Sequence, residues 1–352
     1  MQVIPAKHIG FCFGVERAIS LARKAAAQDG VYTYGALIHN SDVIAKLEEE
    51  GIHAANSLAD IPPGATAVIR SHGLSPKERQ ALENRAGKVI DATCPFVARI
   101  HHIVGQQAEA GRTILLFGAS SHPEVQGIAG YGEKSQVYIL ERVEDTQMLP
   151  SLEKACLVSQ TTAKLTDFQM VEEILRKKIK DLKVFHTICT ETRQRQEEVE
   201  GLSKKCTHIL VVGGHDSSNT QKLAAVCKKN CKHVQSIANL EEVLLENIDT
   251  NDIIGVVGGA STPNWIIMEV ITRMSELEKT MAESPELEKV EAEEAATVET
   301  SVRPPQRRPW KPPRRKHLWP KKRPSPALRK HSKRPWFVFG MDRSLRALCF
   351  RL

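Results

Sequence analysis

The sequence predicts an α/β fold of three similar lobes that meet at a shared centre, followed by a tail that does not fold. Three observations lead to this prediction. Short β-branched runs alternate with helical patterns up to about residue 281, which favours α/β units with parallel sheets. One cysteine stands in the same kind of loop in each of three domain-sized stretches, namely Cys12, Cys94 and Cys189. After about Lys279 the composition changes.

The alternation of strand-like and helix-like stretches sets the order of the elements. The short apolar runs predict strands at Ala67–Arg70, Lys88–Ala92, Thr113–Phe117, Gln136–Leu140, Ala155–Ser159, Val184–Thr187, His208–Val212 and Ile253–Val257. The stretches between them predict helices at Val15–Ala27, Ser41–Glu50, Pro76–Arg85, Val97–Ala110, Thr166–Lys180, Arg193–Cys206, Asn219–Lys229 and Asn264–Thr280. The predicted body covers residues 1–281, with lobes over about 14–95, 96–190 and 191–281, the last together with 1–13.

The three lobe cysteines share one local setting. Each follows a strand end or a loop and stands at the start of a predicted helix. Helix N-termini lower the pKa of a thiol and favour the thiolate, which is the form that binds metals. If the three side chains converge, they leave one iron of a cubane cluster without a protein ligand, and an open metal position suits a Lewis-acid catalyst. The alternative for each is a buried, small apolar side chain.

The other cysteines lie in different settings. Cys156 stands inside an apolar strand and Cys206 at a helix end, so both fit buried thiols. Cys227 and Cys231 have helical spacing, but no second pair accompanies them, and we expect structural thiols there. Disulfides are not expected, because the cysteines are widely spaced in a long chain whose N-terminus lacks the apolar stretch of a signal peptide.

Three histidines occupy equivalent loops. His39, His72 and His122 each follow a strand-like run. Ligands of open α/β sheets bind at the carboxyl ends of the strands, and an imidazole N–H can donate to a phosphate. The three loops together predict an anion pocket, whereas a single loop histidine is more often an ordinary surface residue.

Hydroxyl and amide side chains follow two further strands in the same way. Ser217, Ser218 and Asn219 open one helix, and Ser261 precedes another. Backbone N–H groups at helix starts, together with Ser and Asn donors, bind phosphates well, although simple N-capping is the alternative. Because neither a Walker motif nor a Rossmann glycine motif after the first strand is present, a nucleotide is not the expected ligand.

Glu124 is the candidate proton donor. It lies two residues after His122, and a carboxyl group in a largely dry pocket can hold a proton at neutral pH and deliver it. Thr161 and Thr162 end another strand and are placed to orient a ligand. Without these neighbours, Glu124 would be an ordinary surface acid.

Taken together, these segments resemble the 4-hydroxy-3-methylbut-2-enyl diphosphate reductases of the non-mevalonate isoprenoid pathway. Each segment is weak alone, but all occur in the family's order within residues 1–281. They are Gly10–Ile19, Leu37–Asn40, Arg70–Gly73, Asp91–Pro95, His122–Gly127, Ser159–Thr162, Ile188–Gln194, Ser217–Asn219 and Gly259–Pro263.

The resemblance implies a role for each matching position. Cys12, Cys94 and Cys189 match the ligands of one 4Fe–4S cluster with an open iron, and Thr192 is a less certain member of that motif. Glu124 matches the proton source, and Thr161 a neighbour of the substrate hydroxyl. The positions that match the diphosphate site are His39, His72, His122, Ser217, Ser218, Asn219 and Ser261.

The resemblance also implies a fold and a reaction. The fold is three α/β lobes in a trefoil around the cluster. The reaction is a two-electron reductive dehydroxylation of a small allylic diphosphate, which gives isopentenyl and dimethylallyl diphosphates. A ferredoxin or a flavodoxin would supply the electrons.

The charge of the chain is segregated. Residues 303–352 hold 17 Lys and Arg and one acid, Asp342, so they carry +16, and the total of +7 leaves −9 for residues 1–302. The basic average is therefore no sign that the body binds nucleic acid. Residues 282–302 are rich in Glu and Ala and predict an acidic linker or a lone helix, whereas 303–352 predict a disordered, Pro-rich basic tail.

Two explanations of the tail stay open, and it does not resemble the RNA-binding S1 domains that follow an acidic linker in some relatives. Codons for Glu-Ala or Glu-Glu, read one base late, give Lys-Pro or Arg-Lys pairs, so a frameshifted acidic linker after about Val302 is one hypothesis. A genuine nucleic-acid-binding tail is the other. The nucleotide sequence of the gene decides between them.

Two function classes compete with the reductase. One is a phosphoester-binding enzyme that uses His and carboxylate groups without a cluster. The other is an RNA-binding protein, for which only the tail argues. With no apolar run long enough to cross a membrane and no signal peptide, we expect a cytoplasmic location and no membrane partner.

Overall fold

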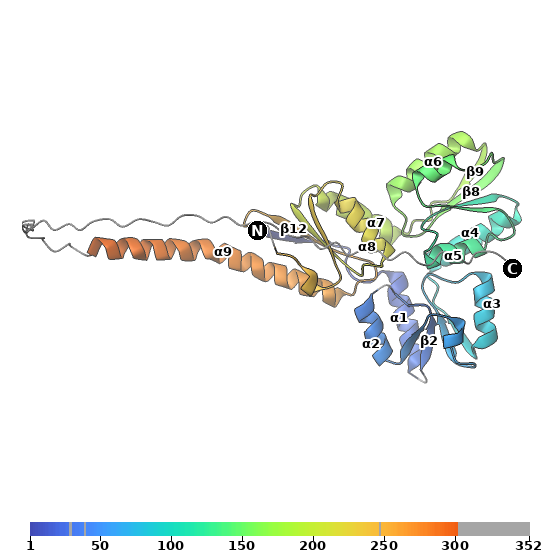
Figure 1. Ribbon diagram of the computed structural model, residues 1–352, viewed down its shortest axis with the longest axis horizontal. Helices are drawn as coiled ribbons and strands as arrows, with labels where there is room; N and C mark the ends of the chain where they lie inside the picture. Colours follow the sequence, from blue (N-terminus) through green and yellow to red (C-terminus); the bar gives the residue numbers. More distant parts are fainter. Residues whose placement is uncertain (28–29, 39, 246–247, 302–352) are drawn as a thin grey trace, which may run out of the picture. The chain divides into compact units, whose positions relative to one another are not determined.

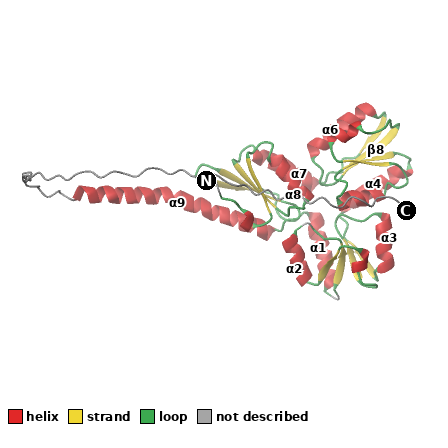
Figure 2. Ribbon diagram, in the orientation of Figure 1, coloured by secondary structure: helices red, strands yellow, loops and turns green. Residues whose placement is uncertain are grey.

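The computed structural model describes residues 1–27, 30–38, 40–245 and 248–301, and residues 1–297 form one compact unit. Twelve strands in the described residues form three sheets of four, and every strand pair is parallel. Figure 1 follows the chain through the three sheets, and Figure 2 shows helices flanking each of them. The predicted fold of three similar α/β lobes with parallel sheets is confirmed.

The first sheet along the chain has the strand order β3-β2-β4-β5. Its strands are β2 (Val31–Tyr34), β3 (Ile52–Ala55), β4 (Thr66–Ile69) and β5 (Lys88–Asp91). Its helices are α1 (Phe13–Ala26), α2 (Ser41–Glu49) and α3 (Pro76–Arg85), with a short 3-10 turn, η1 (Leu58–Asp60). The start of α3 is fixed by a capping box, in which the Glu78 N–H donates to the Ser75 hydroxyl and the Ser75 N–H donates to the Glu78 carboxylate.

The second sheet has the order β7-β6-β8-β9. Its strands are β6 (Thr113–Phe117), β7 (Val137–Leu140), β8 (Lys154–Ser159) and β9 (Asp181–Val184). Its helices are α4 (Pro95–Glu109), α5 (Pro123–Gly130) and α6 (Leu165–Lys178), with η2 (Val143–Gln147). Ile114 and Leu116 pack into one apolar cluster and Leu115 into another, because successive side chains of a strand point to opposite faces. The sheet is thus covered on both sides, as parallel sheets require.

The third sheet joins the two ends of the described chain, in the order β1-β12-β10-β11. Its strands are β1 (Gln2–Pro5), β10 (His208–Val212), β11 (His233–Ile237) and β12 (Ile253–Gly258). Its helices are α7 (Thr190–Ser203), α8 (Ser218–Cys227) and α9 (Asn264–Ser301), with η3 (Leu240–Glu242). The register pairs Gln2 with Ile253 and Pro5 with Val256. Pro5, which has no N–H to donate, stands at the end of an edge strand, where this is tolerated.

Several predicted elements were wrong. Strands β1, β2, β3 and β11 and helix α5 were not predicted, and the strand expected at Val184–Thr187 lies at Asp181–Val184. Residues beyond Val184 still follow β8, since the Phe185 N–H donates to Leu157 and the Thr187 hydroxyl to Ser159, but they form a loop. Helix α9 is longer than the predicted one and runs through most of the expected linker. The basic tail, 303–352, lies outside the described residues.

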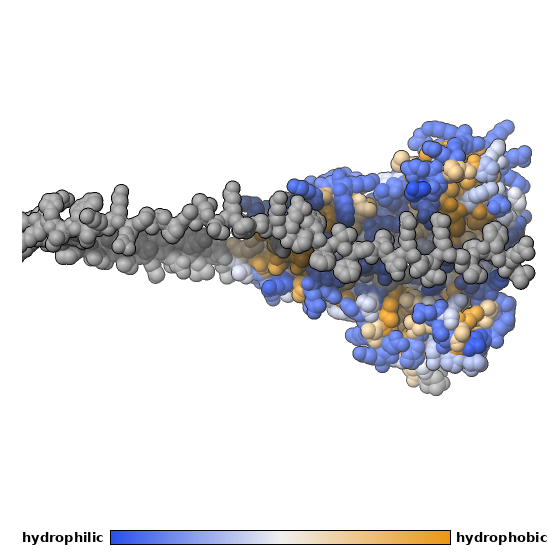
Figure 3. Space-filling model, in the orientation of Figure 1, coloured by the Kyte–Doolittle hydropathy of each residue, from blue (hydrophilic) through white to orange (hydrophobic). Residues whose placement is uncertain are grey.

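The face of the molecule visible in Figure 3 is largely hydrophilic where it is coloured, with scattered hydrophobic patches. In the part of the chain that the structure describes, no helix combines the length and apolar character that a membrane span needs.

Candidate functional site

Loops from all three lobes line one cavity of about 100 Å³, which we name the site cavity. These loops follow the carboxyl ends of parallel strands, the edge at which such sheets bind ligands. The candidate residues that line it are Cys12, His72, Cys94, His122, Glu124, Thr161, Thr162, Cys189, Ser217, Ser218, Asn219 and Ser261. His39 lies outside the described residues. The structure brings these side chains together, and their individual roles stay predictions.

Each cysteine of the site cavity is the N-cap residue of a helix. Cys12 precedes α1, Cys94 precedes α4 and Cys189 precedes α7, so these helices begin two or three residues earlier than predicted. The Cys189 sulfur accepts from the Thr192 N–H at 3.4 Å and lies 3.0 Å from the Thr192 hydroxyl. A helix N-terminus carries partial positive charge, which favours a thiolate there.

The buried thiols influence one another. Burial raises the pKa of Cys189 to about 11, hydrogen bonds from Thr192 act in the opposite direction, and the charges of Cys12 and Glu124 add to the rise. Burial likewise raises the pKa of Cys94, and the charge of Cys12 contributes. A thiolate on one cysteine therefore disfavours a thiolate on the next. A bound metal removes this conflict, because its positive charge stabilises coordinated thiolates.

Gly14 leaves space between two of the sulfur atoms. A Cβ at this position would lie 2.7 Å from the Cys94 sulfur and 3.9 Å from the Cys12 sulfur. Within the described residues, no group of three or more His, Cys, Asp or Glu side chains could hold a single metal ion. In an iron–sulfur cluster, however, each thiolate binds a different iron, so the ligands need not meet at one point. The space beside Gly14 and three thiols on the same cavity therefore fit a multi-iron cluster.

The loop that carries Cys12 is held by a buried arginine of α7. The Arg195 guanidinium donates to the carbonyl of Gly10 at 2.9 Å and to that of Gly258 at 3.1 Å. Gly10 has φ +82°, and a Cβ there would meet the Asn264 side chain, so the turn requires glycine. The sequence gave no sign of Arg195, because its partners come from distant parts of the chain.

Glu124 is buried, with 2% of its surface exposed, and both carboxylate oxygens are held by one residue. The Thr161 N–H donates to Oε1 at 2.6 Å, and the Thr161 hydroxyl donates to Oε2 at 2.7 Å. Burial raises the pKa of Glu124, whereas the bonds from Thr161 and the charge of Lys222 lower it. Because the rise prevails, Glu124 keeps a proton to higher pH than an exposed glutamate does.

The two described histidines of the site cavity face each other. The rings of His72 and His122 meet edge to face, with 5.2 Å between their centroids. His122 is also the N-cap of α5, and its Nδ1 accepts from the Glu124 N–H at 3.1 Å. An Nδ1 that accepts leaves the proton of the neutral ring on Nε2, so His122 has a donor for a ligand oxygen.

Hydroxyl and amide groups form another wall of the site cavity, at the start of α8. Ser217 is the N-cap of this helix, so the N-capping alternative holds for it, and Ser261 donates to its hydroxyl at 3.1 Å. Asn219 is only 5% exposed, and neither polar atom of its amide has a hydrogen-bond partner among the described residues. A buried amide without partners costs about 1–3 kcal/mol, so this side chain is built to meet a ligand or water.

Sequence reasoning missed Lys222 and the role of Gln160. The fully buried Gln160 amide donates to Thr162 at 3.0 Å and to Ser218 at 3.4 Å, and it accepts from Lys222 Nζ at 3.4 Å. Gln160 thus connects the end of β8 with the start of α8. Burial lowers the pKa of Lys222 to about 8, although the charge of Glu124 opposes this. The only signal in the sequence is helical spacing, since Lys222 lies one turn after Ser218.

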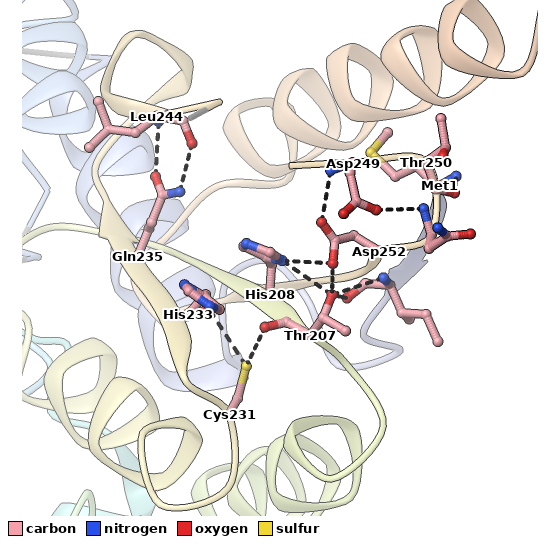
Figure 4. Close-up of polar contacts among 12 residues, drawn as sticks. Met1, Thr207, His208, Cys231, His233, Gln235, Leu244, Asp249, Thr250 and Asp252 are labelled. Atoms are coloured by element: carbon pink, nitrogen blue, oxygen red, sulfur yellow. Dashed lines mark hydrogen bonds and ion pairs between the residues drawn. The ribbon is translucent and has the colours of Figure 1, made fainter. Parts of the chain in front are cut away.

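The remaining described cysteines lie away from the site cavity. Cys206, Cys227 and Cys231 belong to one apolar cluster beside β10 and β12, and Cys156 is buried beside β6. Figure 4 shows the Cys231 sulfur directed at two backbone carbonyls, that of Thr207 at 3.2 Å and that of His233 at 3.5 Å. None of the four lines the site cavity.

A family model described as LytB protein matches residues 3–275. The chain belongs to the LytB protein family. The LytB relatives include the 4-hydroxy-3-methylbut-2-enyl diphosphate reductase of Caldanaerobacter subterraneus subsp. tengcongensis, which is 42% identical over 282 residues, 79% of this chain and 98% of the relative. The reductase of Syntrophotalea carbinolica is 37% identical over 283 residues, 79% of this chain and all of the relative.

Solved LytB structures are similar as well. The E-1-hydroxy-2-methyl-but-2-enyl-4-diphosphate reductase of Plasmodium falciparum matches with a TM-score of 0.72 and 28% identity, over 77% of this chain and 87% of that one. An (E)-4-hydroxy-3-methyl-but-2-enyl diphosphate reductase matches with a TM-score of 0.58 and 35% identity, over 78% of this chain and all of that one. The family resemblance seen in the sequence is confirmed.

Proposed function

We propose that this LytB family member is an iron–sulfur reductase that converts 4-hydroxy-3-methylbut-2-enyl diphosphate to isopentenyl and dimethylallyl diphosphates. The names of its relatives support this activity. The observation that carries it is the meeting of three N-cap cysteines with the buried Glu124 on one cavity. A phosphoester-binding enzyme without a cluster would have no use for three thiols there.

Cys12, Cys94 and Cys189 would hold one 4Fe–4S cluster. A bound cluster of this kind supplies electron transfer, and an iron without a protein ligand supplies Lewis acidity. Thr192 holds the Cys189 side chain in place from the first turn of α7. Arg195 fixes the loop before Cys12.

The diphosphate would bind at the wall formed by the start of α8 and the two histidine loops. The amide of Asn219 lacks partners, and the hydroxyls of Ser217, Ser218 and Ser261 lie beside it. The N-terminus of α8 adds partial positive charge. His72 and His122 stand on the same cavity, and we assign His39 to this set as well.

Glu124 would supply the proton. The reaction consumes two electrons and two protons, breaks the C–O bond, forms one C–H bond and releases water. Burial keeps Glu124 protonated, and Thr161 fixes both of its oxygens. Protonation at either end of an allylic system gives two isomers, which accounts for two products. A ferredoxin or flavodoxin would deliver the electrons, in the cytoplasm, and we place the lobe boundaries near residues 95 and 190.

Reductive turnover by anaerobically purified protein tests this proposal. We expect brown protein with broad visible absorption, and we expect both products to form when a low-potential dye supplies electrons. Protein that carries a full cluster but forms no product would contradict the proposed activity. A colourless Cys94→Ser variant would link the cluster to this cavity.

A further inference from the structure

A second cavity, of about 420 Å³, lies behind two of the proposed ligand cysteines, and we name it the flank cavity. Its wall comes from the first turns of α4 and α7, the start of α6 and the loop that leads to Cys189. Residues of this wall include Phe96, Arg99, Gln169, His186, Ile188 and Arg193. The proposed function gives these residues no part.

The flank cavity reaches the immediate neighbourhood of the proposed cluster. Phe96, two residues after Cys94, lines both cavities. Ile188 and Thr190, on either side of Cys189, line the flank cavity. A molecule in the flank cavity therefore comes within one or two residues of two ligand cysteines without entering the substrate side, where Glu124 is almost fully buried.

The rim of the flank cavity is positively charged. Arg99 and Arg193 are exposed, and neither forms an ion pair within the described part of the chain. The N-termini of α4 and α7 add partial positive charge at the same place. Glu197 is the one carboxylate among the lining residues, and His186 lies 3.6 Å from Glu172 nearby. This rim stands out on a body, residues 1–302, that carries −9.

We propose that the flank cavity is the docking surface for an acidic protein that carries single electrons. This proposal rests on the proposed function, because a two-electron reduction needs a donor that reaches the cluster. Two reduced carriers each lose one electron here, and the two protons enter on the substrate side. A positive rim attracts an acidic carrier to the one place where the otherwise acidic body would not repel it.

Charge reversal at the rim tests the proposal. The variant Arg99→Glu/Arg193→Glu is compared with wild type in two assays, one driven by a reduced flavodoxin or ferredoxin and one by a small low-potential dye. We expect the KM for the protein donor to rise about tenfold or more and to lose much of its salt dependence. The dye-driven rate and the visible absorption should stay within about twofold of wild type, because the dye does not depend on docking.

The matched control is Lys77→Glu/Lys88→Glu. Both lysines are exposed, make no ion pair among the described residues, and lie on α3 and at the amino end of β5, outside both cavities. We expect this variant to leave the KM for the donor unchanged. Direct binding of the flavodoxin or ferredoxin to each holoenzyme, measured by surface plasmon resonance, should follow the same order.

An unchanged KM and unchanged binding in the rim variant would overturn the proposal. An equal loss in the control variant would also overturn it, because the effect would then reflect total charge. Absence of turnover in the wild-type dye assay would instead contradict the proposed function, so the two failures are distinguishable.

Discussion

Two groups of three cysteines in this protein show how position decides the chemistry of a side chain. Cys12, Cys94 and Cys189 come from three different loops, cap three helices and line a polar cavity. Cys206, Cys227 and Cys231 come from one lobe and pack in one apolar cluster. Burial alone does not separate the groups, since it raises the pKa of Cys189 to about 11 and that of Cys227 to about 12.

The difference lies in what surrounds the sulfur atoms. The first group has helix N-termini, the space at Gly14 and the donors of Thr192. The second has apolar side chains of β10, α8 and β12 and backbone carbonyl acceptors. We therefore expect thiolate ligands in the first group and protonated, space-filling thiols in the second.

The largest effect is expected when the same substitution is made in both groups. Cys94→Ser should abolish turnover and the visible absorption, because a hydroxyl is a poor substitute for a thiolate ligand. Cys227→Ser should keep both, and lower the free energy of unfolding by about 1–3 kcal/mol through a buried hydroxyl without a good partner. Absorption spectra, turnover and denaturant unfolding measure this. Loss of the absorption in Cys227→Ser would break the distinction between the groups.

Glu124→Gln should give the next largest effect. The amide keeps the shape of the side chain but cannot deliver a proton, so kcat should fall about 10²–10⁴-fold while substrate binding changes little. Single-turnover kinetics with a prereduced enzyme measure the chemical step directly. A kcat within a few fold of wild type would show that another group supplies the proton. Glu133→Gln is the control, since this glutamate is exposed and outside the site cavity.

Asn219→Ala should weaken substrate binding without weakening the fold. Its amide has no partner among the described residues, so its removal should cost about 1–2 kcal/mol, roughly tenfold, in substrate affinity. The free energy of unfolding should stay the same or rise, because a buried polar group is lost. Isothermal titration and thermal unfolding check the two parts. Asn239→Ala, at an exposed cap of η3, is the control, and equal effects on affinity would contradict the prediction.

The smallest expected effect is a shift of the pH profile. Burial raises the pKa of Glu124, so activity that needs its proton is complete at low pH and falls as pH rises through that pKa. The positive charge of Lys222 lowers the same pKa. Lys222→Met should therefore move the alkaline limb of kcat to higher pH, and Lys228→Met, on the exposed end of α8, should not. A limb that moves to lower pH would contradict the electrostatic role.

The sequence predicted the elements that carry their own start signals. Helix α3 was predicted at its observed bounds, because Ser75, Pro76 and Glu78 form a complete local signal. Strands β1, β3 and β11 are four or five residues long and lie at sheet edges, so they lack the apolar run of a central strand. Strand β2 is central, and its alternating Val31-Tyr-Thr-Tyr pattern was a usable signal that was missed.

The site shows the same limit. Loops after strands contain the candidate residues, and local setting was enough to single out Cys12, Cys94 and Cys189. Lys222 and Arg195 could not be found this way, because each acts on partners brought near by packing rather than by sequence. Such roles depend on the tertiary arrangement of the lobes.

The most direct test of the central claim relates cluster content to turnover in anaerobically reconstituted wild-type protein. Samples with increasing iron and sulfide content are given 4-hydroxy-3-methylbut-2-enyl diphosphate and a reduced dye, and both products are quantified. The account predicts that the rate rises in proportion to cluster content and is zero without it. Product formation by cluster-free protein, or no product from fully loaded protein, would contradict the account.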